Sequence, residues 1–268
     1  MTLHPTAIID PKAQVHPSVQ VGPFCVIGPE VTIDEGCVLH SHVVITGHTT
    51  VGKNNIFFPF SSIGHRTQDI KHKGGPVQVI IGDGNTFREN VTVNQGADYD
   101  IGLTKIGNNN LFMACSHVAH DCDVHNNCIL ANSVALAGHV VLEDNVIVGG
   151  LSGIYQYCRV GRNAIVGATS GVYKDVIPFG SVYGSRAELE GLNWIGLKRK
   201  NFTKEQILSL RRAYNDIFHG EGVFAERLKL ARAQYANDEF VVSMIHFIEH
   251  SENGIVLPGM NEKMDEQD

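Results

Sequence analysis

The feature of this sequence that most constrains its fold is a six-residue period of large apolar side chains. The period runs unbroken from Leu3 to Ile63, returns briefly from Ile81 to Val93, and runs again from Ile106 to Val172. Two residues before most of these positions stands a small or β-branched residue, and a glycine often follows directly. Each hexapeptide therefore predicts one short strand with two inward-facing side chains, followed by one sharp corner.

Cysteines follow the same period. Five of the six occupy the small inward position, where a thiol acts as a compact apolar filler. These five are Cys25, Cys37, Cys122, Cys128 and Cys158. Cys115 falls one residue off this lattice, and we expect it to be more exposed. Because no CxxC pair occurs, the sequence predicts neither a disulfide framework nor a cysteine-based zinc site.

Composition and charge narrow the class of protein. The 268 residues are 43% hydrophobic and 18% charged, which is ordinary for a globular chain. A formal net charge of -7 disfavours a general nucleic-acid binder. The N-terminal stretch MTLHPTAIID lacks the basic and apolar regions of a signal peptide, and no apolar run approaches the roughly 18 residues of a membrane span. We therefore expect a cytoplasmic protein without a membrane span.

Two interruptions break the repeat, one from His65 to about Gln78 and one from Gln95 to about Thr104. Loops that leave a repeat structure tend to gather on one face and to carry function. From about Glu188 the period disappears altogether. The expected domains are thus residues 1–188, which hold the repeat and its loops, and residues 189–268, which are expected to be helical.

Helical signals support the second domain. Thr203 and Gln206 have the spacing of a capping box, and apolar residues follow at helical intervals. A further helical region is expected over residues 224–250. The acidic tail from Asn261 onward is expected to fray.

The hexapeptide pattern resembles that of the hexapeptide-repeat acyltransferases. This resemblance implies an all-β solenoid plus α, namely a left-handed parallel β-helix of hexapeptide repeats with a C-terminal α-helical domain. It also implies three hexapeptides, and therefore eighteen residues, in each coil. Neighbouring coils should lie about 4.7 to 4.9 Å apart, as neighbouring strands of a sheet do.

With that coil length, the stretch SHVAHDC, residues 116–122, becomes a candidate site. Ser116 and Val118 take inward positions, so His117, His120 and Asp121 should point out of the coil. One coil beyond His120 stands Gly138 and two coils beyond stands Gln156, while His139 stacks on Asp121. A histidine beside an unhindered backbone N–H would suit acyl transfer, although a merely polar outer face would show the same pattern.

A longer set of motifs resembles a narrower family, the UDP-N-acetylglucosamine acyltransferases of lipid A synthesis. The motifs are LFMACSHVAHDCDVHNNCILANSVALAGHV, HPTAIID, VGPFCVIGP, SHVVITGHT, QDIKHKGGP, GLTKIG and NWIGLKRKNF, and they span essentially the whole chain. The resemblance implies transfer of an R-3-hydroxyacyl group from acyl carrier protein to the 3-hydroxyl of UDP-N-acetylglucosamine. It implies no metal and no cofactor beyond the acyl carrier donor, and a homotrimer with its site between subunits.

The same resemblance implies roles for individual residues. His120 would be the general base, Asp121 would orient it, and Gly138 would offer its N–H to the oxyanion. Ala168 matches the position whose bulk limits acyl-chain length. Further matches would contact substrate or position the acyl chain, and these are Asp69, Lys71, His117, His139, Tyr155, Gln156, Asn193 and Arg199. Asp69 and Lys71 would face His120 of another subunit, and the last three would lie at the nucleotide end.

Basic residues are the candidates to meet the acidic carrier protein. They are Lys198, Lys200, Arg211 and Arg212. A solvated helix face explains the two arginines equally well.

Departures from the family pattern leave alternatives open. Tyr155 stands where many members have His, and residues 94–96 read Asn-Gln-Gly where His-Arg-Gly is common. Neither Tyr nor Asn is a cation near neutral pH, so an N-acyltransferase acting on a 3-amino sugar is an alternative. A sugar O-acetyltransferase and a non-catalytic binding protein are others. The spacing of His120 and His125 also resembles zinc carbonic anhydrases of this fold.

Overall fold

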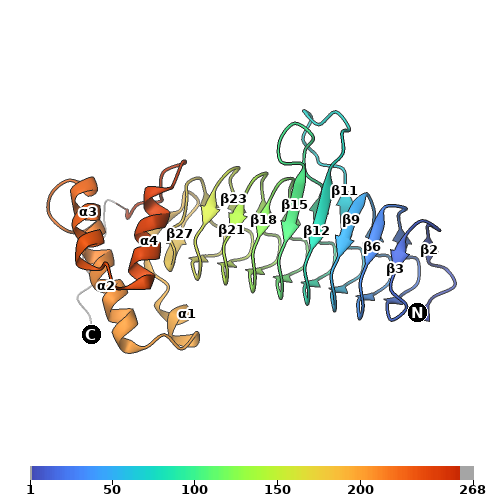
Figure 1. Ribbon diagram of the computed structural model, residues 1–268, viewed down its shortest axis with the longest axis horizontal. Helices are drawn as coiled ribbons and strands as arrows, with labels where there is room; N and C mark the ends of the chain where they lie inside the picture. The colour runs from blue at the N-terminus through green and yellow to red at the C-terminus, as the bar shows by residue number, and fades with distance from the viewer. Residues whose placement is uncertain (1, 260–268) are drawn as a thin grey trace.

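The computed structural model describes residues 2–259, which form a long stack of coils with helices at the C-terminal end (Figure 1). Most strands are two residues long, and they stack into three sheets that run the length of the coil. Within the described residues every strand pair is parallel except that of β27 with β28. The expected left-handed parallel β-helix of hexapeptide repeats with a C-terminal α-helical region is confirmed.

The three sheets each take every third strand of the repeat. Sheet A contains β1 (Thr2–Leu3), β4 (Gln20–Val21), β7 (Val38–Leu39), β10 (Ile56–Phe57), β13 (Thr86–Phe87), β16 (Leu111–Phe112), β19 (Ile129–Leu130), β22 (Ile147–Val148), β25 (Ile165–Val166), β27 (Gly180–Tyr183) and β28 (Glu188–Leu192). Sheet B contains β2 (Ile8–Ile9), β5 (Val26–Ile27), β8 (Val44–Ile45), β11 (Ser62–His65), β14 (Thr92–Asn94), β17 (His117–Val118), β20 (Ala135–Leu136), β23 (Gly153–Ile154) and β26 (Gly171–Val172). Sheet C contains β3 (Gln14–Val15), β6 (Val31–Ile33), β9 (His48–Val51), β12 (Gln78–Ile81), β15 (Leu103–Ile106), β18 (Asp123–Val124), β21 (Val141–Leu142) and β24 (Arg159–Val160).

The core is built from the six-residue period. Phe57, Phe87 and Phe112 belong to successive coils and stack inside them, with ring centroids 4.8 and 4.7 Å apart. This distance matches the spacing of neighbouring strands, because each ring rides on its own strand of sheet A. The five cysteines of the repeat are buried and Cys115 is exposed, as the period predicts.

Both interruptions of the repeat are loops, and Figure 1 shows them together on one side of the stack. Residues 66–77 connect β11 to β12, and residues 95–102 connect β14 to β15. The second loop is pinched at its base, since a Cβ on Gly96 would lie 2.1 Å from the carbonyl carbon of Gly102. The backbones approach so closely only because Gly96 has no side chain.

Four helices follow the coils. They are α1 (Trp194–Arg199), α2 (Lys204–Phe218), α3 (Phe224–Gln234) and α4 (Glu239–Glu249). The capping box of Thr203 and Gln206 at the start of α2 is confirmed. The helical region expected over residues 224–250 is divided in two, because the Asp238 carboxylate caps a new helix by accepting from the N–H groups of Phe240 and Val241.

The boundary expected at residue 188 falls inside β28, which still pairs with β27 up to Leu192. The acidic tail from Asn261 onward lies outside the described residues. None of the helices in residues 2–259 combines the length and the apolar character that crossing a membrane would need.

Candidate active site

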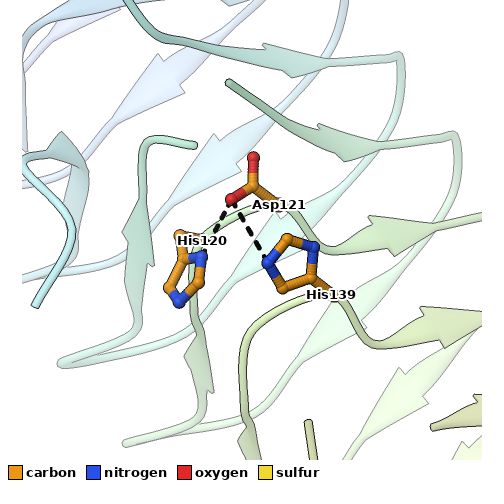
Figure 2. Close-up of side chains that lie close together, drawn as sticks. All are labelled: His120, Asp121 and His139. Atoms are coloured by element: carbon orange, nitrogen blue, oxygen red, sulfur yellow. Dashed lines mark hydrogen bonds and ion pairs between the residues drawn. The ribbon is translucent and has the colours of Figure 1, made fainter. Parts of the chain in front are cut away.

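His120, Asp121 and His139 form the centre of the candidate site (Figure 2). His120 and Asp121 occupy the corner after β17, and His139 occupies the same corner one coil later, after β20. Asp121 Oδ2 accepts a hydrogen bond from His120 Nδ1 at 2.8 Å and lies 3.7 Å from His139 Nε2. The expected stacking of Asp121 on His139 is confirmed, and all three side chains are buried.

The loop of residues 95–102 fixes the orientation of the Asp121 carboxylate. The Ala97 N–H donates to Oδ2 at 3.0 Å, and the Leu103 N–H donates to Oδ1 at 3.2 Å. Because the carboxylate also accepts from His120 Nδ1, that nitrogen carries the ring proton. The lone pair of a neutral His120 is therefore on Nε2.

Gly138 makes room for the His120 imidazole. A Cβ at Gly138 would lie 2.5 Å from both Cε1 and Nε2 of His120, so any side chain there would displace the ring. Gly138 is buried, and within residues 2–259 its N–H makes no hydrogen bond to the backbone. A candidate base thus adjoins an N–H group that makes no backbone hydrogen bond within residues 2–259, which is the pairing that acyl transfer needs.

The loop of residues 66–77 brings a second carboxylate to His120. Asp69 Oδ2 lies 3.5 Å from His120 Nε2 of the same chain. The expectation that Asp69 faces His120 of another subunit stays a prediction, and within one chain the loop of residues 66–77 already brings Asp69 to His120. The Lys71 N–H donates to Asp69 Oδ1 at 2.8 Å, and the Lys71 ammonium lies 6.0 Å from the centroid of the Tyr99 ring.

Two residues of the 95–102 loop join the site without having been predicted. The Tyr99 hydroxyl donates to Asp69 Oδ2 at 2.6 Å, and Asp100 Oδ2 lies 3.6 Å from His139 Nε2. The six-residue period stops at this loop, so spacing could not place either side chain. Only their position in an interruption of the repeat could have marked them.

The electrostatics of the site favour neutral outer histidines and an ionised Asp69. The Tyr99 hydroxyl holds the pKa of Asp69 below its ordinary value, and the same hydrogen bond raises the pKa of Tyr99. Burial lowers the pKa of His139, against the opposing pull of its carboxylate neighbours. Burial also lowers the pKa of His117, whose Nδ1 lies 2.7 Å from Thr92 Oγ1.

A groove of about 340 Å³ starts beside the site and follows sheet B toward the C-terminal helices. One row of its lining consists of side chains in register on successive coils, namely His117, Ala135, Gly153 and Gly171. A second row, one corner further on, consists of Ala119, Ala137, Tyr155 and Tyr173. The small residues leave the space open, and the rings of Tyr155 and Tyr173 lie 5.4 Å apart at its far end.

Other predicted site residues lie apart from His120 within one chain. Gln156 is half-buried at the corner two coils away. Asn193 caps α1, where its Oδ1 accepts from the Gly196 N–H and its Nδ2 donates to the Asn163 carbonyl. Arg199 is exposed on α1, at the C-terminal end of the stack (Figure 1). Ala168 is exposed at a corner after β25 and is not among the residues that line the groove.

The zinc-site alternative pairs His120 with His125, but the structure does not bring these two histidines into one group of possible ligands. His125 pairs with Asp123, Nε2 to Oδ2 at 3.7 Å, and this pairing raises the pKa of His125. Across residues 2–259, the group of donor atoms close enough to hold a metal is that of His120, Asp121 and His139, within 4.8 Å of one another. Because Asp121 already accepts three hydrogen bonds, this group fits an oriented base better than a ligand set.

Comparisons with known proteins cover nearly the whole chain. A family described as UDP N-acetylglucosamine O-acyltransferase, domain 2, matches residues 175–256, and bacterial transferase hexapeptide repeats match residues 2–47 and 103–138. An acyl-[acyl-carrier-protein]–UDP-N-acetylglucosamine O-acyltransferase of Janthinobacterium sp. (strain Marseille) is 46% identical over 95% of this chain and 98% of its own length. One of Anaeromyxobacter sp. (strain Fw109-5) is 44% identical over 95% and 99%. The solved structure of LpxA from Acinetobacter baumannii superposes with a TM-score of 0.92 at 42% identity, covering 96% of this chain and 100% of its own.

Proposed function

Because the chain belongs to the family of UDP-N-acetylglucosamine O-acyltransferases, we propose the family's reaction for it. It transfers an R-3-hydroxyacyl group from acyl carrier protein to the 3-hydroxyl of UDP-N-acetylglucosamine, the first step of lipid A synthesis. The proposal extends to the residues that carry the reaction.

His120 is the general base in this proposal. Its Nε2 removes the proton from the acceptor hydroxyl while the hydroxyl oxygen attacks the carbonyl carbon of the acyl thioester. Asp121 keeps the ring proton on Nδ1 and stabilises the imidazolium that forms. The Gly138 N–H donates to the oxyanion of the tetrahedral intermediate. The intermediate then collapses, the carbon–sulfur bond breaks, and His120 returns the proton to the departing thiolate.

The observation that carries this assignment is the 2.8 Å hydrogen bond between His120 Nδ1 and Asp121 Oδ2. It directs the basic nitrogen away from the Asp121 carboxylate and toward Asp69, whose Oδ2 lies 3.5 Å from Nε2. A histidine that served only to fill space would not need a partner that is itself fixed by two backbone N–H groups.

The groove along sheet B is the proposed seat of the acyl chain, because its small apolar lining begins beside the base. Asp69, Lys71, His117 and His139 contact the sugar or the start of the acyl chain in this proposal. The nucleotide end falls to Tyr155, Gln156, Asn193 and Arg199, where the guanidinium suits phosphate oxygens. Ala168 limits acyl-chain length only if an adjoining subunit brings it to the groove.

The proposal includes a homotrimer that works in the cytoplasm without a metal or a bound cofactor. Acyl carrier protein, which is acidic, meets the exposed basic residues of the C-terminal helices. Arg211 and Arg212 are exposed on α2, and Lys198 is exposed on α1. Lys200 contacts Asn145 Oδ1 and is less free to take part.

One experiment tests the reaction directly. Purified protein is mixed with UDP-N-acetylglucosamine or its 3-amino analogue and with R-3-hydroxyacyl carrier proteins of several chain lengths, and products are identified by mass spectrometry. An ester on the ordinary sugar supports the proposal. Product from the amino sugar alone would replace it with amide formation, and no product with either sugar would overturn it.

A further inference from the structure

The Tyr99 hydroxyl and the His120 imidazole both face one carboxylate oxygen, Oδ2 of Asp69. Asp69 Oδ2 accepts the Tyr99 hydroxyl at 2.6 Å and lies 3.5 Å from His120 Nε2. The other oxygen of Asp69 accepts the Lys71 N–H at 2.8 Å. Both oxygens of the Asp69 carboxylate therefore accept hydrogen bonds from the two loops, one from Lys71 and one from Tyr99.

This arrangement matters because Nε2 is the nitrogen with the lone pair. An ionised carboxylate beside an imidazole favours the protonated ring, which is useless as a base. A hydroxyl that donates to the carboxylate oxygen engages one of its lone pairs and disperses part of its charge. The Tyr99 hydrogen bond is short enough to do this, and it lowers the pKa of Asp69 itself.

We propose that Tyr99 is a positioning residue for the acyl transfer. Its hydroxyl holds Asp69 in place and occupies the oxygen nearest to His120, so that Nε2 stays available to accept the proton of the acceptor hydroxyl. The inference rests on the proposed role of His120 as base. It adds a residue from a loop that the repeat does not specify.

Other groups face His120, and they define what a test must hold constant. Asp121 binds Nδ1, and the His139 ring meets the His120 ring edge-on with centroids 5.1 Å apart. Asp100 lies behind His139, 3.6 Å from its Nε2. The Lys71 ammonium lies over the Tyr99 ring, 6.0 Å from its centroid. None of these contacts involves the Tyr99 hydroxyl, so Tyr99→Phe leaves them in place and removes the hydrogen bond to Asp69 Oδ2.

The test compares Tyr99→Phe with the parent protein in the pH dependence of kcat/KM. The acidic limb of the profile should move up by roughly one pH unit, since an unshielded Asp69 stabilises the imidazolium. In an Asp69→Asn background, adding Tyr99→Phe should not move the acidic limb from its position in Asp69→Asn alone. An unmoved limb in Tyr99→Phe, or equal movement in both backgrounds, would overturn the inference.

A second readout needs no turnover. The protonation of His120 can be followed by NMR of the imidazole nitrogens, with the His120→Gln variant identifying its signals. In Tyr99→Phe the midpoint should rise by the same amount as the kinetic limb. If the parent protein transfers no acyl group, the proposed function fails while this titration still decides whether Tyr99 shields His120. A substitution that merely loosened the loop would lower kcat at every pH without moving the midpoint.

Discussion

Asp69 Oδ2 lies 3.5 Å from His120 Nε2, and both residues belong to the same chain. The two loops that interrupt the repeat fold back over the coils that carry the candidate base. One chain thus brings together the proposed base, the carboxylate of Asp121 and the carboxylate of Asp69.

Mixed assemblies test that arrangement. Co-expressed subunits carry either Asp69→Asn or His120→Ala, and each variant alone is expected to have lowered activity. Their mixed assemblies should be no more active than the variants alone, because no subunit then has both residues. Differently tagged subunits allow the mixed species to be purified and assayed. Recovery of a third or more of the expected sites would show that Asp69 serves His120 of a neighbour.

Removal of the base should abolish most turnover. His120→Ala is expected to lower kcat by on the order of 10² or more, the usual size of a general-base effect. Binding of the nucleotide sugar should change little. The thermal unfolding midpoint should fall only modestly, because the buried imidazole belongs to the outer corner and not to the core of the coil. Steady-state kinetics and calorimetry measure the two effects, and an unchanged kcat would remove His120 from its role.

Gly138 should tolerate no side chain. Gly138→Ala places a methyl group 2.5 Å from the His120 ring, and the ring must move. A displacement near 1 Å can cost on the order of 10² in rate, so kcat/KM is expected to fall by about that factor. Unfolding midpoint and assembly size serve as controls. Full activity in this variant would show that the ring position is not critical.

The preferred length of the acyl chain should change when a residue that lines the groove is enlarged. A Cβ at Gly153 meets nothing within 4 Å, so Gly153→Val fits the strand but fills the groove. The favoured acyl chain should become shorter, as shown by mass spectrometry of products from a mixture of donors. Ala168→Met is the matched comparison, because Ala168 lies outside the groove of its own chain. A change with Ala168→Met alone would place the acyl chain on another surface.

The free energy of unfolding should decrease at acidic pH because of His117. Burial lowers the pKa of folded His117 below its ordinary value of about 6.5, so the unfolded chain binds the proton more readily. The contribution of His117 is full above about pH 6.5 and is lost as the pH falls below that value. Denaturant unfolding at several pH values should show a smaller loss in His117→Gln than in the parent. Parallel losses in the two proteins would contradict this assignment.

Sequence reasoning was most successful where the repeat applies. The eighteen-residue coil placed Gly138 against His120 and His139 against Asp121, because stacked coils keep a fixed register. It was least successful for the two loops, where neither the contact of Asp69 with His120 of its own chain nor the contacts of Tyr99 and Asp100 were foreseen. Asn193 shows another limit, since in one chain its amide is committed to capping α1.

The amino-acid sequence by itself determined the coil, its inward and outward faces and the chemistry of the residues on the outer corner. Those follow from a period that links each residue to its neighbours one coil away. Only the tertiary structure decided how Asp69, Tyr99 and Asp100 meet the two histidines, because loops outside the repeat take their path from contacts with Asp121 and with each other. Such contacts join residues distant in the chain, and no local spacing encodes them.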